Sequence, residues 1–360
     1  MEKLRLALIG AGRIASKKHL EALLKNSDVI ELVGVCSLIE DKAMALSRKY
    51  AEVLGKKPEV STSADYFFKR DDIDAVAIAT SSGTHYDLTM RALDNGKHVL
   101  VEKPMALSTK HMDQMIDLAK KKNLKLAVSF QNRFNPPIAE LRKKVEDGSF
   151  GRIFYGVASI RWNRNEDYYK QADWRGKWRS DGGVLMNQST HNIDLLQWML
   201  GGDVEEVVGF VENFNHPYIE VEDFGAAIVK FKSGAVGIIE GTSVVYPKNL
   251  EETLSIFGER GTVKIGGLAV NRIEVWRFEN EDSHPMMDLP DPDTVYGHGH
   301  VPLYRDFYES IDSGRDPAIP GEEGRKAVDI VLAIYKSYLE KKPVKFPFDF
   351  SSWEMEGITW

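Results

Sequence analysis

The stretch Leu4–Ala15, "LRLALIGAGRIA", decides how the first part of the chain folds. An apolar run ends at Gly10, and Gly10-Ala11-Gly12-Arg13-Ile14-Ala15 opens a helical pattern that continues through Leu24. Strand, glycine turn and helix in this order form the dinucleotide-binding fingerprint, here with alanine in the third glycine place. Gly10 permits the tight turn, Gly12 lets the backbone approach a pyrophosphate, and the helix N-terminus offers unpaired N–H groups.

The pattern of apolar runs changes about a third of the way along the chain. Short runs near residues 29–36, 74–80, 98–103 and 124–128 alternate with helical stretches, which predicts a parallel sheet covered on both faces. Longer runs follow, such as "RIFYGVASIRW" and "FGAAIVKFKSGAVGIIEGTSVV", joined by Ser-Gly or Glu-Arg-Gly turns. We therefore predict an α/β chain with an N-terminal Rossmann dinucleotide-binding domain at residues 1–125. A C-terminal α+β domain with an open, mainly antiparallel sheet, for substrate binding and oligomerisation, should occupy residues 126–360.

Composition and charge exclude several classes of protein. Of 360 residues, 43% are hydrophobic and 28% charged, which is ordinary for a globular protein. The net charge of −7 argues against nucleic acid as a partner, and the absence of a long apolar run argues against a membrane span. The apolar start passes directly into the glycine motif, so no signal peptide is predicted. A single cysteine, Cys36, cannot form an intramolecular disulfide and indicates a cytoplasmic location.

Two further strand ends bear on the cofactor. Ser37 follows the second predicted strand, where a carboxylate usually binds the adenosine ribose. No arginine follows Ser37 to hold a 2′-phosphate, so NAD and NADP both stay open, with NAD slightly favoured. The third strand ends in Thr80-Ser81-Ser82-Gly83-Thr84-His85, whose small residues would line the nicotinamide side of the crevice. Ser82 or Thr84 would equally serve as a helix N-cap, and the two roles are compatible.

The segment His98–Ser108, "HVLVEKPMALS", places a lysine at the end of a buried strand. Ligands of open α/β sheets bind at the carboxyl ends of the strands, so Lys103 should face the cofactor crevice. Pro104 keeps Lys103 out of the helical region and allows a cis peptide bond. A surface lysine is the alternative, but together with the fingerprint the position favours a hydrogen bond from Lys103 to a substrate hydroxyl.

A second catalytic candidate lies in "GGVLMNQSTHNIDLLQWMLGG", residues 182–202. Read as a helix, this segment places on one stripe the four residues Asn187, His191, Asp194 and Trp198. Histidine, with a reference pKa of about 6.5, can accept a hydroxyl proton near neutral pH. The alternative is a histidine satisfied by Asp194. We predict that Lys103 and His191 are catalytic and that Asn187 and Asp194 bind the substrate.

The basic stretch "RWNRNEDYYKQADWRGKWRSDGG", residues 161–183, supplies arginines and tryptophans. Arginines can grip a carboxylate or phosphate and indoles can lie against a sugar, so Arg161, Arg175 and Trp174 are predicted to bind the substrate. A solvated loop or a subunit contact is the alternative. His298 and His300 lack a matching set of acidic or cysteine ligands, so we expect no metal and place His298 at the rim of the substrate pocket.

Together these motifs resemble, over essentially the whole chain, the Gfo/Idh/MocA family of nicotinamide-dependent sugar and polyol oxidoreductases. The resemblance implies that Lys103, of the Glu-Lys-Pro motif, and His191, of the later helix, act at the hydroxyl being oxidised. Many members carry aspartate where this sequence has Asn187, which can hydrogen-bond a hydroxyl but cannot act as a base. The wording "LMNQ" to "HNIDLLQW" further resembles the branch of UDP-N-acetyl-2-amino-2-deoxyglucuronate 3-dehydrogenases.

We therefore expect an NAD(P)-dependent dehydrogenase of a sugar or nucleotide sugar, with hydride passing from a ring carbon to nicotinamide. Three alternatives stay open: a free-sugar or inositol dehydrogenase, an NAD-dependent glycosidase and a non-catalytic cofactor-binding sensor. An open sheet with an exposed face favours a homodimer or homotetramer. The residues expected at the cofactor are Gly10, Gly12, Arg13, Ile14, Ser37, Thr80, Ser82, His85, Glu102 and Lys103.

Overall fold

The computed structural model describes residues 3–279, 297 and 299–360, which form two units by their internal contacts. The first unit contains the described residues up to Ala106, His111–Gln131 and Gly299–Arg325; the second contains Leu107–Lys110, the described residues from Asn132 to Gly297, and Lys326–Trp360. The chain therefore passes between the units several times, whereas the sequence pattern suggests one boundary after residue 125. The difference begins at β6 (Leu126–Ser129), which pairs with β5 and so belongs to the first sheet.

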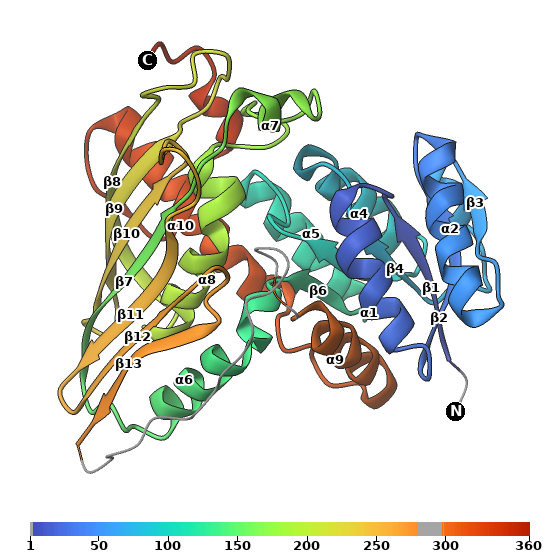
Figure 1. The fold of residues 1–360 in the computed structure, drawn as a ribbon, viewed down its shortest axis with the longest axis horizontal. Coiled ribbons are helices and arrows are strands. Elements are labelled where there is room, and N and C mark those ends of the chain that lie inside the picture. Colours follow the sequence, from blue (N-terminus) through green and yellow to red (C-terminus); the bar gives the residue numbers. More distant parts are fainter. Residues whose placement is uncertain (1–2, 280–296, 298) are drawn as a thin grey trace. The chain divides into compact units, whose positions relative to one another are not determined.

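The first unit is built on the predicted parallel sheet, in the strand order β3-β2-β1-β4-β5-β6 (Figure 1). Its other strands are β1 (Leu4–Ile9), β2 (Ile30–Cys36), β3 (Glu59–Ser61), β4 (Ala75–Ile78) and β5 (His98–Glu102). The strand order reverses between β1 and β4, so a crevice is expected at the carboxyl ends of these two strands. The apolar side chains of β4 are fully buried on both faces, as a covered parallel sheet requires.

Six α-helices have most of their residues in the described part of the first unit. They are α1 (Leu20–Lys25), which continues a π-helical turn at Ala15–His19, α2 (Glu40–Leu54), α3 (Ala64–Phe68), α4 (His85–Asp94), α5 (Thr109–Lys121) and α9 (His300–Ser313). Helix α1 packs against α2 and α9. Thr84 directly precedes α4 but does not cap it, because its hydroxyl bonds the Thr80 hydroxyl at 2.7 Å and the Ser81 carbonyl at 2.8 Å.

The segment after α9 returns to the first sheet and lines its edge. The Val128 N–H donates to the Ile319 carbonyl at 3.0 Å, and Ala127 forms a bridge with Pro320. Helix α10 (Gly321–Glu340) follows directly. No helix within the described ranges is long and apolar enough to cross a membrane.

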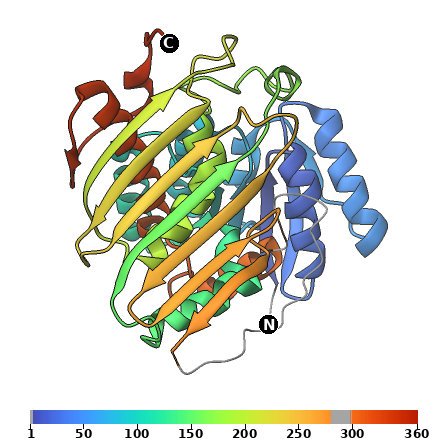
Figure 2. The same ribbon diagram turned by 60° about the vertical axis from the view of Figure 1, so that its left-hand side comes forward.

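The second unit contains an eight-stranded sheet in the order β13-β12-β11-β7-β10-β9-β8-β14 (Figure 2). Its strands are β7 (Ile153–Arg161), β8 (Val204–Glu212), β9 (Phe224–Phe231), β10 (Val236–Thr242), β11 (Glu251–Gly258), β12 (Gly261–Gly266), β13 (Arg272–Phe278) and β14 (Val344–Lys345). Only the β7–β10 pair is parallel. The predicted fold class, a Rossmann sheet followed by a mainly antiparallel sheet, is confirmed.

Helix α8 (Thr190–Met199), preceded by a π-helical turn at Leu185–Ser189, packs on one face of this sheet. Two glycines permit the contact: a Cβ on Gly156 would lie 2.8 Å from the Leu196 side chain, and one on Gly237 would lie 3.1 Å from it. This unit also contains α6 (Pro136–Glu146), α7 (Glu166–Lys170), the later part of α10 and the first two residues of α5.

No helix among the described residues covers the opposite face of the second sheet, which is turned toward the reader in Figure 2. Strand side chains alternate between faces, so apolar residues on this side stay in contact with solvent. Those at least 38% exposed are Tyr155, Val208, Phe210, Ile228 and Ile238, which we call the open-face patch. A monomer seldom leaves such a patch uncovered.

Candidate active site

The glycine turn leaves the protein main chain open to a ligand at the position where the dinucleotide fingerprint requires close approach. Gly10 has a φ of +110°, and a Cβ on it would lie 2.3 Å from the Ala79 carbonyl oxygen. A Cβ on Gly12, by contrast, would meet no atom within 4 Å, so the backbone there is open. The first helical hydrogen bond runs from Ser16 N–H to the Gly12 carbonyl at 3.0 Å. The amides before it, flanked by exposed Arg13 and half-buried Ile14, fit a dinucleotide pyrophosphate.

Small polar residues surround the same edge of the sheet. The Ser37 hydroxyl, just beyond β2, accepts a hydrogen bond from Ile39 N–H at 3.2 Å. Thr80 and Ser82 follow β4, the strand next to β1, and Ser82 is only 7% exposed. The predicted cofactor residues of β1, β2 and β4 therefore lie at the carboxyl ends of three neighbouring strands.

His85 forms part of the frame below this edge. Its ring is 1% exposed, with Nδ1 2.8 Å from the Pro104 carbonyl and Nε2 3.3 Å from the Thr80 carbonyl. Burial lowers the pKa of His85, and a neutral imidazole donates from one nitrogen only. The ring nitrogens of His85, a residue predicted to lie at the cofactor, face main-chain carbonyls and connect the Thr80 loop to the turn after Lys103.

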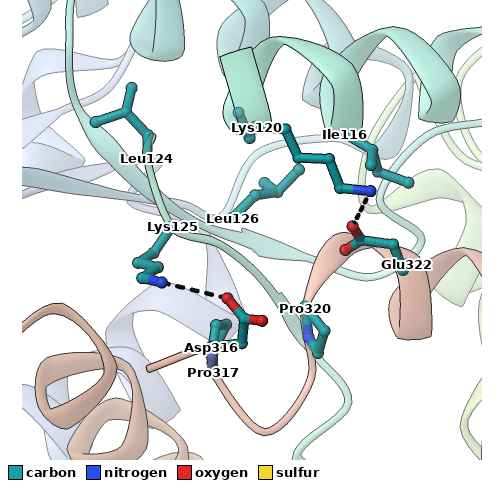
Figure 3. A pocket seen from close by; sticks show the side chains of 10 residues that line it. Ile116, Lys120, Leu124, Lys125, Leu126, Asp316, Pro317, Pro320 and Glu322 are labelled. Carbon is teal, nitrogen blue, oxygen red and sulfur yellow. Dashed lines mark hydrogen bonds and ion pairs between the residues drawn. The ribbon is translucent and has the colours of Figure 1, made fainter. Parts of the chain in front are cut away.

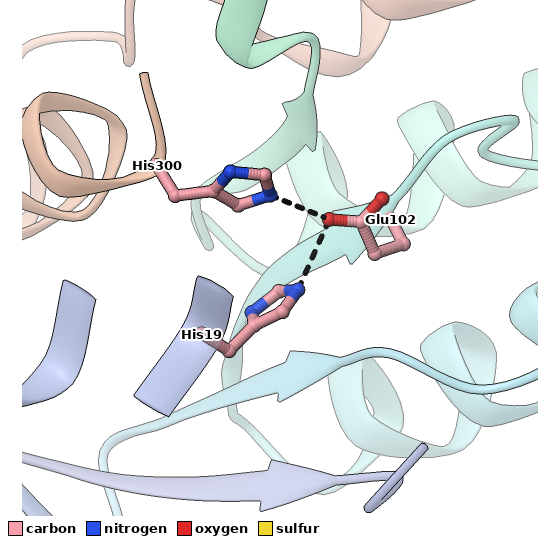
Figure 4. A group of neighbouring side chains, drawn as sticks. All are labelled: His19, Glu102 and His300. Carbon is pink, nitrogen blue, oxygen red and sulfur yellow. Dashed lines mark hydrogen bonds and ion pairs between the residues drawn. The ribbon is translucent and has the colours of Figure 1, made fainter. Parts of the chain in front are cut away.

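Glu102, also predicted to contact the cofactor, lies instead in a buried network (Figure 4). Its Oε1 is 3.0 Å from His19 Nε2 and 3.4 Å from His300 Nε2. Burial opposes ionisation, but the hydrogen bonds from His19 and His300 hold the pKa of Glu102 well below its usual range. Tyr304, whose pKa burial raises, lies with its hydroxyl 2.6 Å from His19 Nδ1. His19 therefore links the Tyr304 hydroxyl to the Glu102 carboxylate.

Sequence reasoning missed His19 and Tyr304 in this network. His19 is 83 residues from Glu102 and 285 residues from Tyr304, so no local spacing marks them as partners.

Lys103, the next residue after Glu102, is half-buried just beyond β5, and its bond to Pro104 is cis. Lys103 thus follows the strand adjacent to β4, at the same edge of the sheet as the glycine turn.

A separate pocket lies at the amino end of strand β6 in the first sheet (Figure 3). Leu124 and Lys125 line it just before β6 begins, so it faces the amino end of that strand. Ion pairs border it, from Lys120 to Glu322 at 2.6 Å and from Lys125 to Asp316 at 3.2 Å. Because ligands of such sheets bind at the carboxyl ends, this pocket is not the cofactor crevice.

In the second unit, a buried acid fixes the start of the helix that carries His191. Glu222 Oε1 accepts hydrogen bonds from Leu185 N–H at 3.0 Å and from the Tyr335 hydroxyl at 2.8 Å. Burial raises the pKa of Glu222 to about 8. A Cβ on Gly183 would lie 1.8 Å from Glu222 Oε2, which explains why glycine stands before the helix.

Asn187 and His191 lie one turn apart on this helix. Asn187 is half-buried and its Nδ2 donates to Asp181 Oδ1, while Asp181 Oδ2 accepts from Gly176 N–H at 2.8 Å. His191 is 8% exposed. Sequence reasoning missed Asp181, which places a buried carboxylate beside Asn187; only its position six residues before Asn187 could have suggested it.

Asp194, predicted to bind the substrate, lies in a buried ion pair with Arg133. Asp194 Oδ2 lies 2.7 Å from Arg133 Nε, Oδ1 lies 2.6 Å from Nη2, and the two side chains are 1% and 4% exposed. Trp198, from the same predicted stripe, lies under two guanidiniums, those of Arg133 and Arg142, each 4.7 Å from the ring. The π-helical turn before residue 190 breaks the regular spacing on which the stripe depends.

Arg161, also predicted to bind the substrate, forms ion pairs with two glutamates. Its guanidinium pairs with Glu240 at 2.5 and 2.9 Å and with Glu251 at 2.5 Å, and these carboxylates raise its pKa against a smaller opposing effect of burial. The preceding residue, Ile160, is fully buried on the side of α8. Alternation along β7 therefore turns Arg161 to the uncovered face of the sheet.

Arg175 and Trp174 lie near the helix that carries His191. The Arg175 guanidinium stacks 4.8 Å from the Trp174 ring and 4.3 Å from the Tyr168 ring. The Tyr168 hydroxyl accepts a hydrogen bond from Gln188 Nε2 at 3.1 Å, three residues before His191. His298 lies outside the described residues.

A glycine turn built for a pyrophosphate, in a Rossmann unit, and a helix with a weakly exposed histidine define the class: a dinucleotide-dependent oxidoreductase. Residues 4–130 match the model of the oxidoreductase family with an NAD-binding Rossmann fold, and residues 138–264 match the GFO/IDH/MocA C-terminal domain. The chain belongs to the Gfo/Idh/MocA oxidoreductase family.

Several relatives match almost the whole chain. The WlbA dehydrogenases of Bordetella pertussis and Chromobacterium violaceum, both solved with NADH and UDP-GlcNAcA, are 34% and 36% identical. The matches cover 97% of this chain and 100% and 98% of those chains, with TM-scores of 0.84 and 0.85. Myo-inositol 2-dehydrogenase of Thermotoga maritima is 26% identical over 95% of this chain and 98% of its own length.

Proposed function

We propose that this oxidoreductase oxidises a ring hydroxyl of a sugar or nucleotide sugar. The observation that carries the proposal is the position of Lys103, at the carboxyl edge that also holds the glycine turn and Thr80. NAD, when bound, accepts the hydride. Lys103 donates a hydrogen bond to the reacting oxygen, and His191 takes the hydroxyl proton. Asn187, oriented by Asp181, hydrogen-bonds the substrate.

We further propose that the substrate is a nucleotide-linked uronate, oxidised at C3 of a UDP-N-acetylhexosaminuronate. The support is the similarity to the two WlbA dehydrogenases, which at 34% and 36% identity exceeds the 26% for the myo-inositol enzyme. The experiment must distinguish this function from three alternatives. They are a free-sugar or inositol dehydrogenase, an NAD-dependent glycosidase and a cofactor-binding sensor.

The test follows reduced nicotinamide by absorbance, with NAD and NADP each offered nucleotide sugars, uronates, hexoses and inositols. We expect net reduction with UDP-linked uronates, and a fall in kcat of about 10²- to 10⁴-fold in Lys103→Ala and His191→Ala. Lys110→Ala, at an exposed position of α5, is the matched control. Bound cofactor without net reduction by any substrate would contradict a dehydrogenase and favour the glycosidase or the sensor.

We also propose that the chain assembles as a homodimer or homotetramer through the open-face patch and works in the cytoplasm. An apolar surface of this kind is commonly covered by a second copy. Its single cysteine, Cys36, is buried, and burial raises the pKa of the thiol to about 11, so it stays protonated and unreactive. A chain with this cysteine usage suits a reducing compartment.

A further inference from the structure

Two arginines near the catalytic helix differ from their neighbours in having no acidic partner. Arg161 pairs with two glutamates, and Arg179 pairs with Glu356 at 2.7 Å. Among the described residues, no carboxylate oxygen lies within 4.0 Å of a guanidinium nitrogen of Arg164 or Arg175. Two positive charges are therefore left uncompensated within the described part of this unit.

Both guanidiniums stack over one ring. The Arg175 guanidinium carbon lies 4.3 Å from the centroid of Tyr168, and that of Arg164 lies 5.1 Å from it. Each arginine also contacts an indole: Arg164 stacks 4.7 Å from Trp162, and Arg175 stacks 4.8 Å from Trp174. Stacking on aromatic rings holds a guanidinium plane in place without neutralising its charge. We call these five residues the arginine cradle.

The arginine cradle is attached to the helix that carries His191. Arg175 Nη1 and Gln188 Nε2 both donate to the Tyr168 hydroxyl, the second at 3.1 Å. The main chain next to Arg175 is held as well, because the Gly176 N–H donates to Asp181, the partner of Asn187. The arginine cradle is therefore fixed to positions 187 and 188, within about one turn of His191.

The charges of the arginine cradle are also partly desolvated. Arg164 and Arg175 are half-buried, and the Nε atom of each is buried without a hydrogen-bond partner in the described structure. Arg164 Nη1 donates only to neutral acceptors, the Asn163 carbonyl at 2.6 Å and Asn249 Oδ1 at 3.1 Å. A half-buried cation without a counter-charge is costly, and an arriving anion removes that cost.

We infer that the arginine cradle binds the anionic group of the substrate, a carboxylate or phosphate; the inference rests on the proposed sugar-oxidising function. Planar guanidinium forks match both anions by paired N–H donors. Trp162 is 5% exposed and supports Arg164 from below, whereas half-buried Trp174 offers apolar surface beside the charge, as a sugar or base requires. Substrate selection by charge thus takes place next to the residue that removes the hydroxyl proton.

The test measures binding separately from turnover. The NADH-loaded enzyme is titrated with glucuronate, UDP, UDP-N-acetylglucosamine and UDP-glucuronate, and binding is followed by calorimetry and tryptophan fluorescence. Arg164→Gln and Arg175→Gln should raise Kd about 10- to 100-fold for ligands that carry the recognised anion. Arg179→Gln, an exposed arginine with its own acidic partner, should stay within about twofold of wild type.

The ligands separate the two sources of the anion. A loss confined to glucuronate and UDP-glucuronate assigns the arginine cradle to the uronate carboxylate; a loss that includes UDP and UDP-N-acetylglucosamine assigns it to phosphate. Unchanged affinity for all four ligands in both variants overturns the inference. If a glutamine variant unfolds, Arg164→Lys and Arg175→Lys keep the charge but lose the paired donors, and should still weaken binding severalfold.

Failure of the inference differs from failure of the proposed function. If binding depends on the arginine cradle but no nicotinamide is reduced, the dehydrogenase activity is refuted and the anion site is supported. Turnover with unchanged KM in both cradle variants removes the anion site and leaves the dehydrogenase standing.

Discussion

Replacing Asp194 by alanine should destabilise the second unit rather than weaken substrate binding. The carboxylate makes two hydrogen bonds of 2.6 and 2.7 Å to Arg133, and its side chain is 1% exposed. Breaking a buried ion pair by removing one partner costs about 3–5 kcal/mol. Against a total stability of about 5–15 kcal/mol for a domain, this loss is large.

Urea unfolding followed by tryptophan fluorescence and circular dichroism measures the change, and KM is determined on the folded fraction. We expect a lower midpoint for Asp194→Ala with KM within about threefold of wild type. The double variant Arg133→Met with Asp194→Leu removes both charges and should recover most of the stability. An unchanged unfolding midpoint together with a tenfold higher KM would show that the carboxylate serves the substrate and refute the reasoning.

Three further perturbations test other parts of the structure. Gly10→Ala, whose Cβ would lie 2.3 Å from the Ala79 carbonyl, should abolish NADH binding measured by fluorescence titration; retained affinity would contradict the role of the turn. Burial raises the pKa of Glu252 to about 8, above its unfolded value of about 4.3, so the folded state keeps a proton that the unfolded state loses. Stability should therefore fall as pH rises from about 4.5 to 8, and Glu252→Gln should flatten this fall in urea midpoints; parallel profiles would argue against it. Ile228→Lys, in the open-face patch, should lower the oligomer mass found by light scattering, and an unchanged mass would place the interface elsewhere.

Local patterns account for the parts of the fold that the sequence predicts well. The run before Gly10, the strand before Lys103 and the Ser-Gly turns between longer strands each act over a few residues, so each can be recognised in isolation. The alternation of β7 could also have placed Arg161 correctly, since its neighbour Ile160 is the apolar residue that faces the helix.

The missed features depend on partners far apart in the chain. Arg133 and Asp194 are 61 residues apart, and His19 and Tyr304 are 285 residues apart, so neither pair leaves a mark within any sequence window. The π-helical turn before α8 has no composition of its own. Its extra residue per turn shifts Asn187 relative to His191, Asp194 and Trp198, which all lie in the regular helix α8, so a regular helical projection does not place Asn187 correctly.

The return of residues 299–325 to the first unit bears on how the protein is made. A ribosome has released the whole Rossmann sequence through β6 long before it synthesises His300, which contacts Glu102, and Ile319, which hydrogen-bonds Val128. Until then the nascent first unit lacks the histidine that faces buried Glu102 and the segment that covers the edge strand β6. Most of the second unit is synthesised in that interval, so the first unit can be completed only after most of the second has been made. A nascent chain stalled near residue 280 should therefore bind nicotinamide poorly, although every residue of the glycine turn has already emerged.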